Sequence, residues 1–109
     1  MSAAANPARG EAALVVGGET VRLRPSFEAL VAAEEELGPL FGLVERAAAG
    51  GLRIAEIAGL FWHCVDEPPQ GLTRERLGAA IVERGLAGTT PLLKVLLGQI
   101  LQGASASPA

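Results

Sequence analysis

The sequence predicts an α+β protein, in which an N-terminal two-stranded β-hairpin is followed by a compact bundle of four to five short helices. Two short extended runs, residues 11–16 and 19–24, are joined by a Gly-Gly pair that can adopt the positive φ values of a two-residue hairpin turn. The rest of the chain shows the apolar spacing of helices. Half of the 109 residues are hydrophobic, mostly Leu and Ala, which favours an aliphatic, helix-rich core.

The two strands differ in how clearly the sequence defines them. In the second strand, Val21 and Leu23 alternate with polar residues, as expected for a strand with one buried face, whereas both faces of the first strand are apolar. An isolated hairpin is marginally stable in water. We therefore expect Val21 and Leu23 to pack against helical residues such as Leu30 and Phe61.

The first helix is predicted to start after Ser26, whose hydroxyl can cap it, and to end at Gly38. The three glutamates at 34–36 are expected to form a solvated face, with only Glu34 beside the apolar stripe, because runs of like charge usually face water. The apolar stripe of this helix is expected to contain Phe27, Leu30, Val31 and Leu37.

Four further helices are predicted from apolar spacing and from their end signals, over residues 39–49, about 54–65, 73–85 and 90–102. Thr73 is the expected cap of the third of these helices and Gly85 its end, while Thr90-Pro91 is expected to open the last one. Two prolines at 68–69 prevent the helix before them from continuing.

The last helix is too apolar for an ordinary surface helix, because only three side chains after Pro91 are strongly polar. If the stripe that begins at Leu92 packs inward, the flanking stripe remains available to bind a protein, either a second copy of the chain or an apolar helix of a partner. The candidate protein-binding residues are therefore Leu93, Leu97 and Leu101.

No catalytic chemistry, cofactor or metal is expected. His63 and Cys64 are a base beside a nucleophile, but adjacent helical residues project about 100° apart and do not share a face. One His and one Cys cannot complete a four-ligand zinc site. The paired glycines lack the spacing and the Lys of a phosphate-binding loop. We therefore expect a binding protein rather than an enzyme.

Composition also argues against several classes of partner. The formal net charge is −3, and the nine basic residues are scattered, so no nucleic-acid partner is expected. No secretory signal and no membrane-spanning run is recognisable, and a lone cysteine suits a reducing compartment, so a cytoplasmic protein is expected. Residues 1–8 and 104–109 are predicted to be disordered tails around a single domain at 9–103.

The order of these elements resembles the small gene transfer agent family of phage-like tail proteins, which is grouped with phage tail assembly chaperones. The resemblance begins at Gly10-Glu11-Ala12-Ala13-Leu14, continues through Leu43-Val44-Glu45-Arg46 and Leu52-Arg53-Ile54, and ends near Gly103. It implies an assembly chaperone that binds the tape measure protein, located in the cytoplasm, or a minor structural component of the tail. A small cytosolic adaptor or regulatory module, unrelated to tails, is the alternative from another class.

Overall fold

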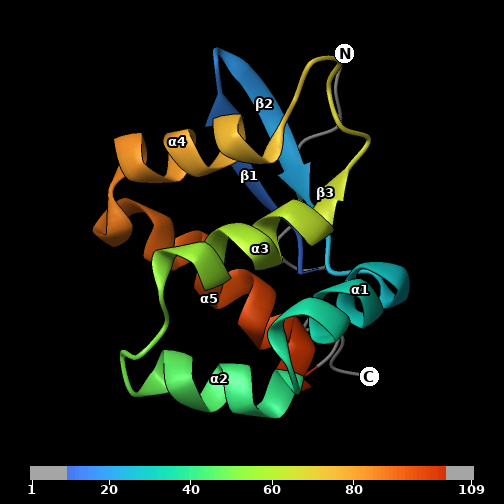
Figure 1. Cartoon of the computed structure of the whole chain (residues 1–109), viewed down its shortest axis with the longest axis vertical. Coiled ribbons are helices and arrows are strands. Elements are labelled where there is room, and N and C mark those ends of the chain that lie inside the picture. The colour runs from blue at the N-terminus through green and yellow to red at the C-terminus, as the bar shows by residue number, and fades with distance from the viewer. Residues whose placement is uncertain (1–9, 103–109) are drawn as a thin grey trace.

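A β-hairpin opens the described part of the chain, which is residues 10–102 of the computed structural model (Figure 1). Strand β1 (Ala12–Val16) pairs antiparallel with β2 (Glu19–Leu23), and Val16 lies opposite Glu19. Gly17 and Gly18 have φ values of 58° and 84°, as a two-residue turn between twisted strands requires. The predicted hairpin and its turn are confirmed.

The sequence did not predict a third strand, β3 (Val65–Asp66), which pairs antiparallel with β2 and gives the sheet order β1-β2-β3. Val65 lies opposite Leu23. Just beyond this pair, the Arg24 amide donates to the Cys64 carbonyl at 2.7 Å. Extending the preceding helix through Val65 was therefore wrong, because pairing with a strand distant in sequence takes this residue out of the helix.

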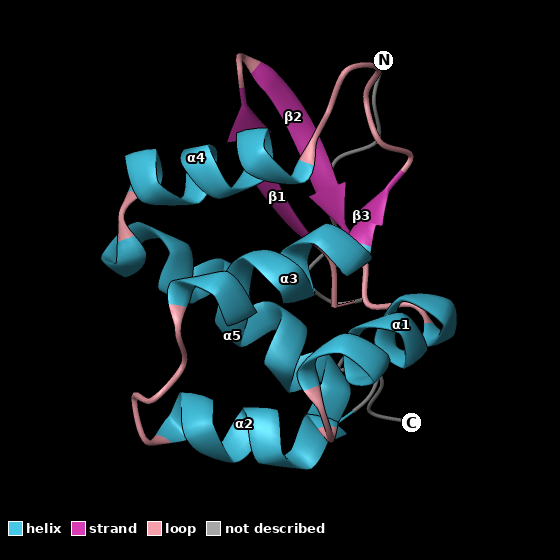
Figure 2. Cartoon of the chain, in the orientation of Figure 1, coloured by secondary structure: helices cyan, strands magenta, loops and turns pink. Residues whose placement is uncertain are grey.

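In the described part of the chain, five helices follow the hairpin (Figure 2). The Ser26 hydroxyl accepts a hydrogen bond from the Ala29 amide at 3.2 Å, and the Thr73 hydroxyl accepts one from the Arg76 amide at 3.1 Å, so both predicted caps are confirmed. Gly38 ends the first helix with a positive φ. The helices are α1 (Phe27–Leu37), α2 (Leu40–Ala48), α3 (Ile54–Cys64), α4 (Arg74–Arg84) and α5 (Leu86–Gln102).

Helix α5 begins more than one turn before the predicted start at Thr90-Pro91, so Pro91 lies inside it. The Thr89 and Thr90 hydroxyls donate to main-chain carbonyls four residues earlier, at 2.9 and 2.8 Å, rather than capping the helix. Proline is tolerated here because Pro91 and Ala87, whose carbonyl loses its helical partner, are both exposed. Buried Thr89 ties the additional first turn to the core.

The sheet and α4 lie at one end of the molecule, α2 lies at the other, and α3 runs between them (Figures 1 and 2). Helix α1 packs on α3, while α4 contacts α3, α5 and β1. Val21, Leu23 and Phe61 are all buried in one core, as predicted, but Leu30 is only half-buried. The largest fully buried side chains include Phe61, Leu14, Leu23, Leu43, Leu60, Leu77, Ile81 and Leu96.

The predicted apolar stripe of α1 is wrong for two of its four residues: Leu37 packs against the core and Leu30 is half-buried, but Phe27 and Val31 do not face inward. Ala29 and Ala33 are the buried residues of this helix, whereas Phe27 is 83% exposed and Val31 is also exposed. Helix α1 contacts α3, and Gly59 of α3 leaves little room there, because a Cβ atom at this position would lie 3.3 Å from Leu37 Cδ2. The small alanine side chains, rather than the aromatic residue at the start of the helix, therefore form the inward face of α1.

Two further predictions are limited by the extent of the described residues. The tails predicted at 1–8 and 104–109 lie outside residues 10–102. Within residues 10–102, none of the helices combines the length and hydrophobicity needed to cross a bilayer.

Candidate protein-binding surface

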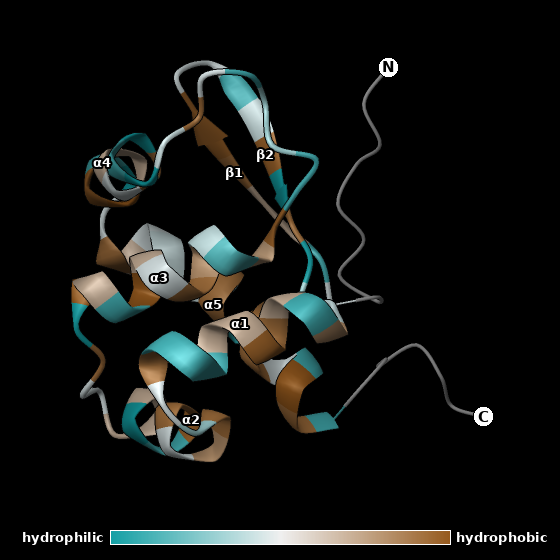
Figure 3. Cartoon of the chain, turned by 45° about the vertical axis from the view of Figure 1, so that its right-hand side comes forward, coloured by the Kyte–Doolittle hydropathy of each residue, from teal (hydrophilic) through white to brown (hydrophobic). Residues whose placement is uncertain are grey.

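An apolar groove lies between α1, α2 and the last turns of α5. We call it the α1–α2–α5 groove. Figure 3 shows α2 at the end of the molecule opposite the hairpin. The groove has a volume of about 220 Å³, and its walls carry one acidic and five apolar side chains. The lining residues are Glu34, Leu40, Phe41, Val44, Ile100 and Leu101.

The groove follows from how α2 is anchored. Leu43 is fully buried, and Phe41, two residues earlier, therefore points away from the core and is 76% exposed. The Glu34 carboxylate accepts a hydrogen bond from the Leu40 amide at 3.1 Å, which joins the end of α1 to the start of α2. Buried Leu43 and the hydrogen bond from the Leu40 amide to Glu34 therefore fix the position of α2, which forms one wall of the groove.

Helix α1 extends the apolar surface beyond the groove. Phe27, Val31 and Glu34 are spaced i, i+4 and i+7, so they lie on one face of the helix. Phe27 and Val31 are both exposed. These two residues and the groove together form what we call the α1–α2–α5 surface.

The three binding residues predicted in α5 lie in different environments. Leu93 and Leu97 are half-buried and pack against the core, whereas Leu101 is 52% exposed and lines the groove. Each step of four residues turns a helix about 40° past a full rotation, so a stripe with this spacing drifts away from buried Leu96 and towards solvent. Only the end of the predicted stripe is accessible.

Sequence reasoning missed the α2 wall of the groove. Leu40, Leu43 and Val44 share one face of α2 by their helical spacing, and Phe41 does not belong to it. Phe41, a large aromatic residue outside the expected buried face, was the sequence feature that could have indicated this surface. The contributions of Phe27 and Val31 were missed for the opposite reason, because their spacing resembles that of a core stripe.

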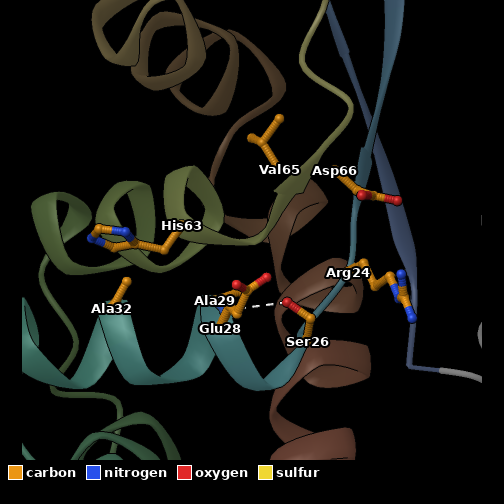
Figure 4. Close-up of a pocket in the computed structure, with 8 residues that line it drawn as sticks. All are labelled: Arg24, Ser26, Glu28, Ala29, Ala32, His63, Val65 and Asp66. Atoms are coloured by element: carbon orange, nitrogen blue, oxygen red, sulfur yellow. Dashed lines mark hydrogen bonds between the residues drawn. The ribbon is translucent and has the colours of Figure 1, made fainter.

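A second cavity, of about 280 Å³, brings together the residue types of a hydrolytic triad, Ser26, His63 and Asp66 (Figure 4). Ser26 and His63 lie on opposite sides of this view, and the Ser26 hydroxyl caps α1. The His63 Nε2 atom lies 2.8 Å from Glu36 Oε1, and Asp66 forms an ion pair with Arg22. Each polar group therefore has a partner other than the one that catalysis would require.

Cys64 is buried, and burial raises the pKa of its thiol to about 12. The thiol is therefore protonated at neutral pH and cannot act as a nucleophile without a base. Within residues 10–102, no group of His, Cys, Asp and Glu side chains is arranged to hold a metal ion.

Glu36 corrects the expectation that the glutamate triplet serves only as a solvated face. Its carboxylate accepts hydrogen bonds from Arg74 and lies against His63, so it connects α1 with α3 and α4. The hydrogen bonds from Arg74 and then His63 lower the pKa of Glu36 to about 2. Glu36 is thus a structural residue, although its side chain is partly exposed.

Comparison with known proteins places the chain in a family. The family described as "Phage tail tube protein, GTA-gp10" matches residues 9–103 of the chain. The chain therefore belongs to this family of gene transfer agent and phage tail proteins, and the resemblance drawn from its sequence is confirmed. No curated protein and no solved structure matched the chain.

Proposed function

We propose that this protein is an assembly chaperone of a phage-like tail, and that its α1–α2–α5 groove holds an apolar helix of the tape measure protein. The observation that carries the proposal is the exposed apolar lining of the groove, above all Phe41 and Leu101. Exposed apolar patches of this kind are typical of interaction sites, and a groove between helices accepts the apolar face of another helix.

The proposed activity is binding without chemistry. Cys64 is buried and protonated, and His63 is engaged by Glu36, so neither residue is available to a substrate. A chaperone of this kind would act in the cytoplasm while the tail is being built and would be absent from the finished particle.

A structural subunit of the tail is the second candidate function, and the family description as a tail tube protein favours it. In that case the α1–α2–α5 surface would contact a neighbouring tail protein or a second copy of the chain, and the protein would remain in the particle. The adaptor alternative loses support, because the family places the chain among tail proteins.

The proposal is tested with purified protein and purified tape measure protein. Replacing Phe41 and Leu101 together by Ala should weaken binding by roughly tenfold or more, since two exposed apolar anchors are removed. The matched control replaces Val82 and Leu86 by Ala, because these two residues are also exposed and apolar but lie on α4 and at the start of α5.

Equal binding by both double variants would remove the groove from the proposal. Mass spectrometry of purified particles then separates the two candidate functions. Absence of the protein from particles supports the chaperone, and a stoichiometric amount in particles supports the structural subunit.

A further inference from the structure

The α1–α2–α5 surface is bordered by carboxylates that have no basic partner within residues 10–102. Glu34 lines the groove, Glu35 lies one turn after Val31, and Glu45 lies one turn after Phe41. We call these three residues the rim glutamates. All three are exposed, and none of them forms an ion pair with another residue in the range 10–102.

Basic side chains near this surface point elsewhere or lie further away. Arg46 of α2 forms an ion pair with Glu56 of α3. Lys94 is seven residues before Leu101 on α5, about 10 Å along the helix axis, and it does not line the groove. Arg24 lies three residues before Phe27 and does not line the groove. The groove therefore combines an apolar centre with a border of negative charge.

From this pattern we infer that the groove binds an amphipathic helix with Lys or Arg on both borders of its apolar face, supplied by a protein other than this chain. Apolar residues of the partner would cover Phe41 and Leu101, while its basic residues would meet the rim glutamates. From Phe27 to Glu34 the α1 side of the surface rises about 10 Å, a length that two turns of a partner helix can cover.

The same charges argue against a second copy as the occupant. In a two-fold symmetric pair, the same patch on both copies meets itself. The rim glutamates of one copy would then lie close to the rim glutamates of the other, and like charges that face each other across an interface oppose association. The inference rests on the proposed function only in taking the partner to be a tail protein.

The experiment compares two synthetic helical peptides with the same leucine face, one with lysines on the borders of that face and the other with glutamates. Binding to the full chain is followed by fluorescence anisotropy at low and high salt. Three exposed charge pairs, each strengthening binding about twofold, predict roughly tenfold tighter binding of the lysine peptide at low salt. This preference should shrink at high salt, because exposed pairs are screened.

A charge-neutral variant tests the rim directly. Replacing Glu34, Glu35 and Glu45 by Gln should abolish the preference, and the amide oxygen at position 34 can still accept the hydrogen bond from the Leu40 amide. The matched control replaces Glu19 and Glu83 by Gln, which are exposed residues on the hairpin and α4, at the other end of the molecule (Figure 1). The control should keep the preference of the wild type.

Each outcome bears on one proposal or on both. Equal binding of the two peptides, or a preference that survives in the rim variant, overturns the inference. The inference is also overturned if light scattering detects a dimer that dissociates in the Phe41→Ala variant, because the occupant of the groove is then a second copy.

Purified tape measure protein distinguishes this inference from the proposed function. If the tape measure protein binds without salt dependence and equally to the rim variant, the proposed function stands and the inference fails. If only the lysine peptide binds, the inference stands and the tape measure protein is the wrong partner. If neither binds, both proposals fail.

Discussion

Replacing Phe41 and Phe61 separately by Ala tests whether the α1–α2–α5 groove is open to solvent or part of the core. Phe61 is 0% exposed, and truncation of a fully buried Phe to Ala costs about 3–5 kcal/mol of the free energy of unfolding. Phe41 is 76% exposed, so only about a quarter of that stabilisation is at stake, or about 1 kcal/mol. The higher helix propensity of Ala offsets a few tenths of this cost.

Urea unfolding followed by far-ultraviolet circular dichroism measures both changes in the free energy of unfolding, with wild type as the reference. A loss of about 1 kcal/mol lowers the Tm of a domain of this size by about 4–8 °C, so Phe41→Ala should remain folded at room temperature. Phe61→Ala should lose a large part of the total stability, which for small domains is about 5–15 kcal/mol.

If Phe41→Ala costs as much as Phe61→Ala, the Phe41 side chain is buried in solution. The groove would then be closed, and both the proposed function and the charge preference of its rim would lose their basis. If Phe41→Ala is mild and also weakens binding of the tail partner, the residue acts at the interface and not through stability.

Arg74 is the main cause of the lowered pKa of Glu36, which is about 2 against an ordinary 4.5. The stabilisation by this carboxylate is therefore complete above about pH 4.5 and is lost as the pH falls towards 2. Glu36→Gln should make the free energy of unfolding depend less on pH in this window. Cys64 should resist a thiol reagent at mildly alkaline pH until urea unfolds the chain, and Cys64→Ala should cost about 1 kcal/mol; fast labelling of folded protein would contradict its burial. Gly78→Ala should raise the Tm, because an added Cβ in α4 meets nothing within 4 Å and Ala is favoured over Gly in helices by about 1 kcal/mol. Gly59→Ala should raise the Tm by less than Gly78→Ala, because its added Cβ would displace the end of the Arg74 side chain, 2.7 Å away, and would crowd Glu36 and Leu37 at 3.3 Å; an equal rise would show that the α1–α3 contact is looser than described.

The sequence by itself determined the features that depend on a few neighbouring residues. The Gly17-Gly18 turn, the caps at Ser26 and Thr73 and the end of α1 at Gly38 lie where they were predicted. The reason is that positive φ values and cap hydrogen bonds involve groups within about four residues of one another. The family resemblance, carried by the same local pattern along the chain, is confirmed as well.

The tertiary structure alone decided which apolar residues face inward. Periodicity assigned Phe27 to an apolar stripe and left Leu93 exposed, but α1 buries Ala29 and Ala33 and exposes Phe27, while Leu93 packs against the core. Strand β3 likewise exists only because β2, distant in sequence, offers an edge for it to pair with. Periodicity shows that a helix has an apolar side, but the shape and size of the side chains across the contact decide which part of that side is buried, because interiors are close-packed.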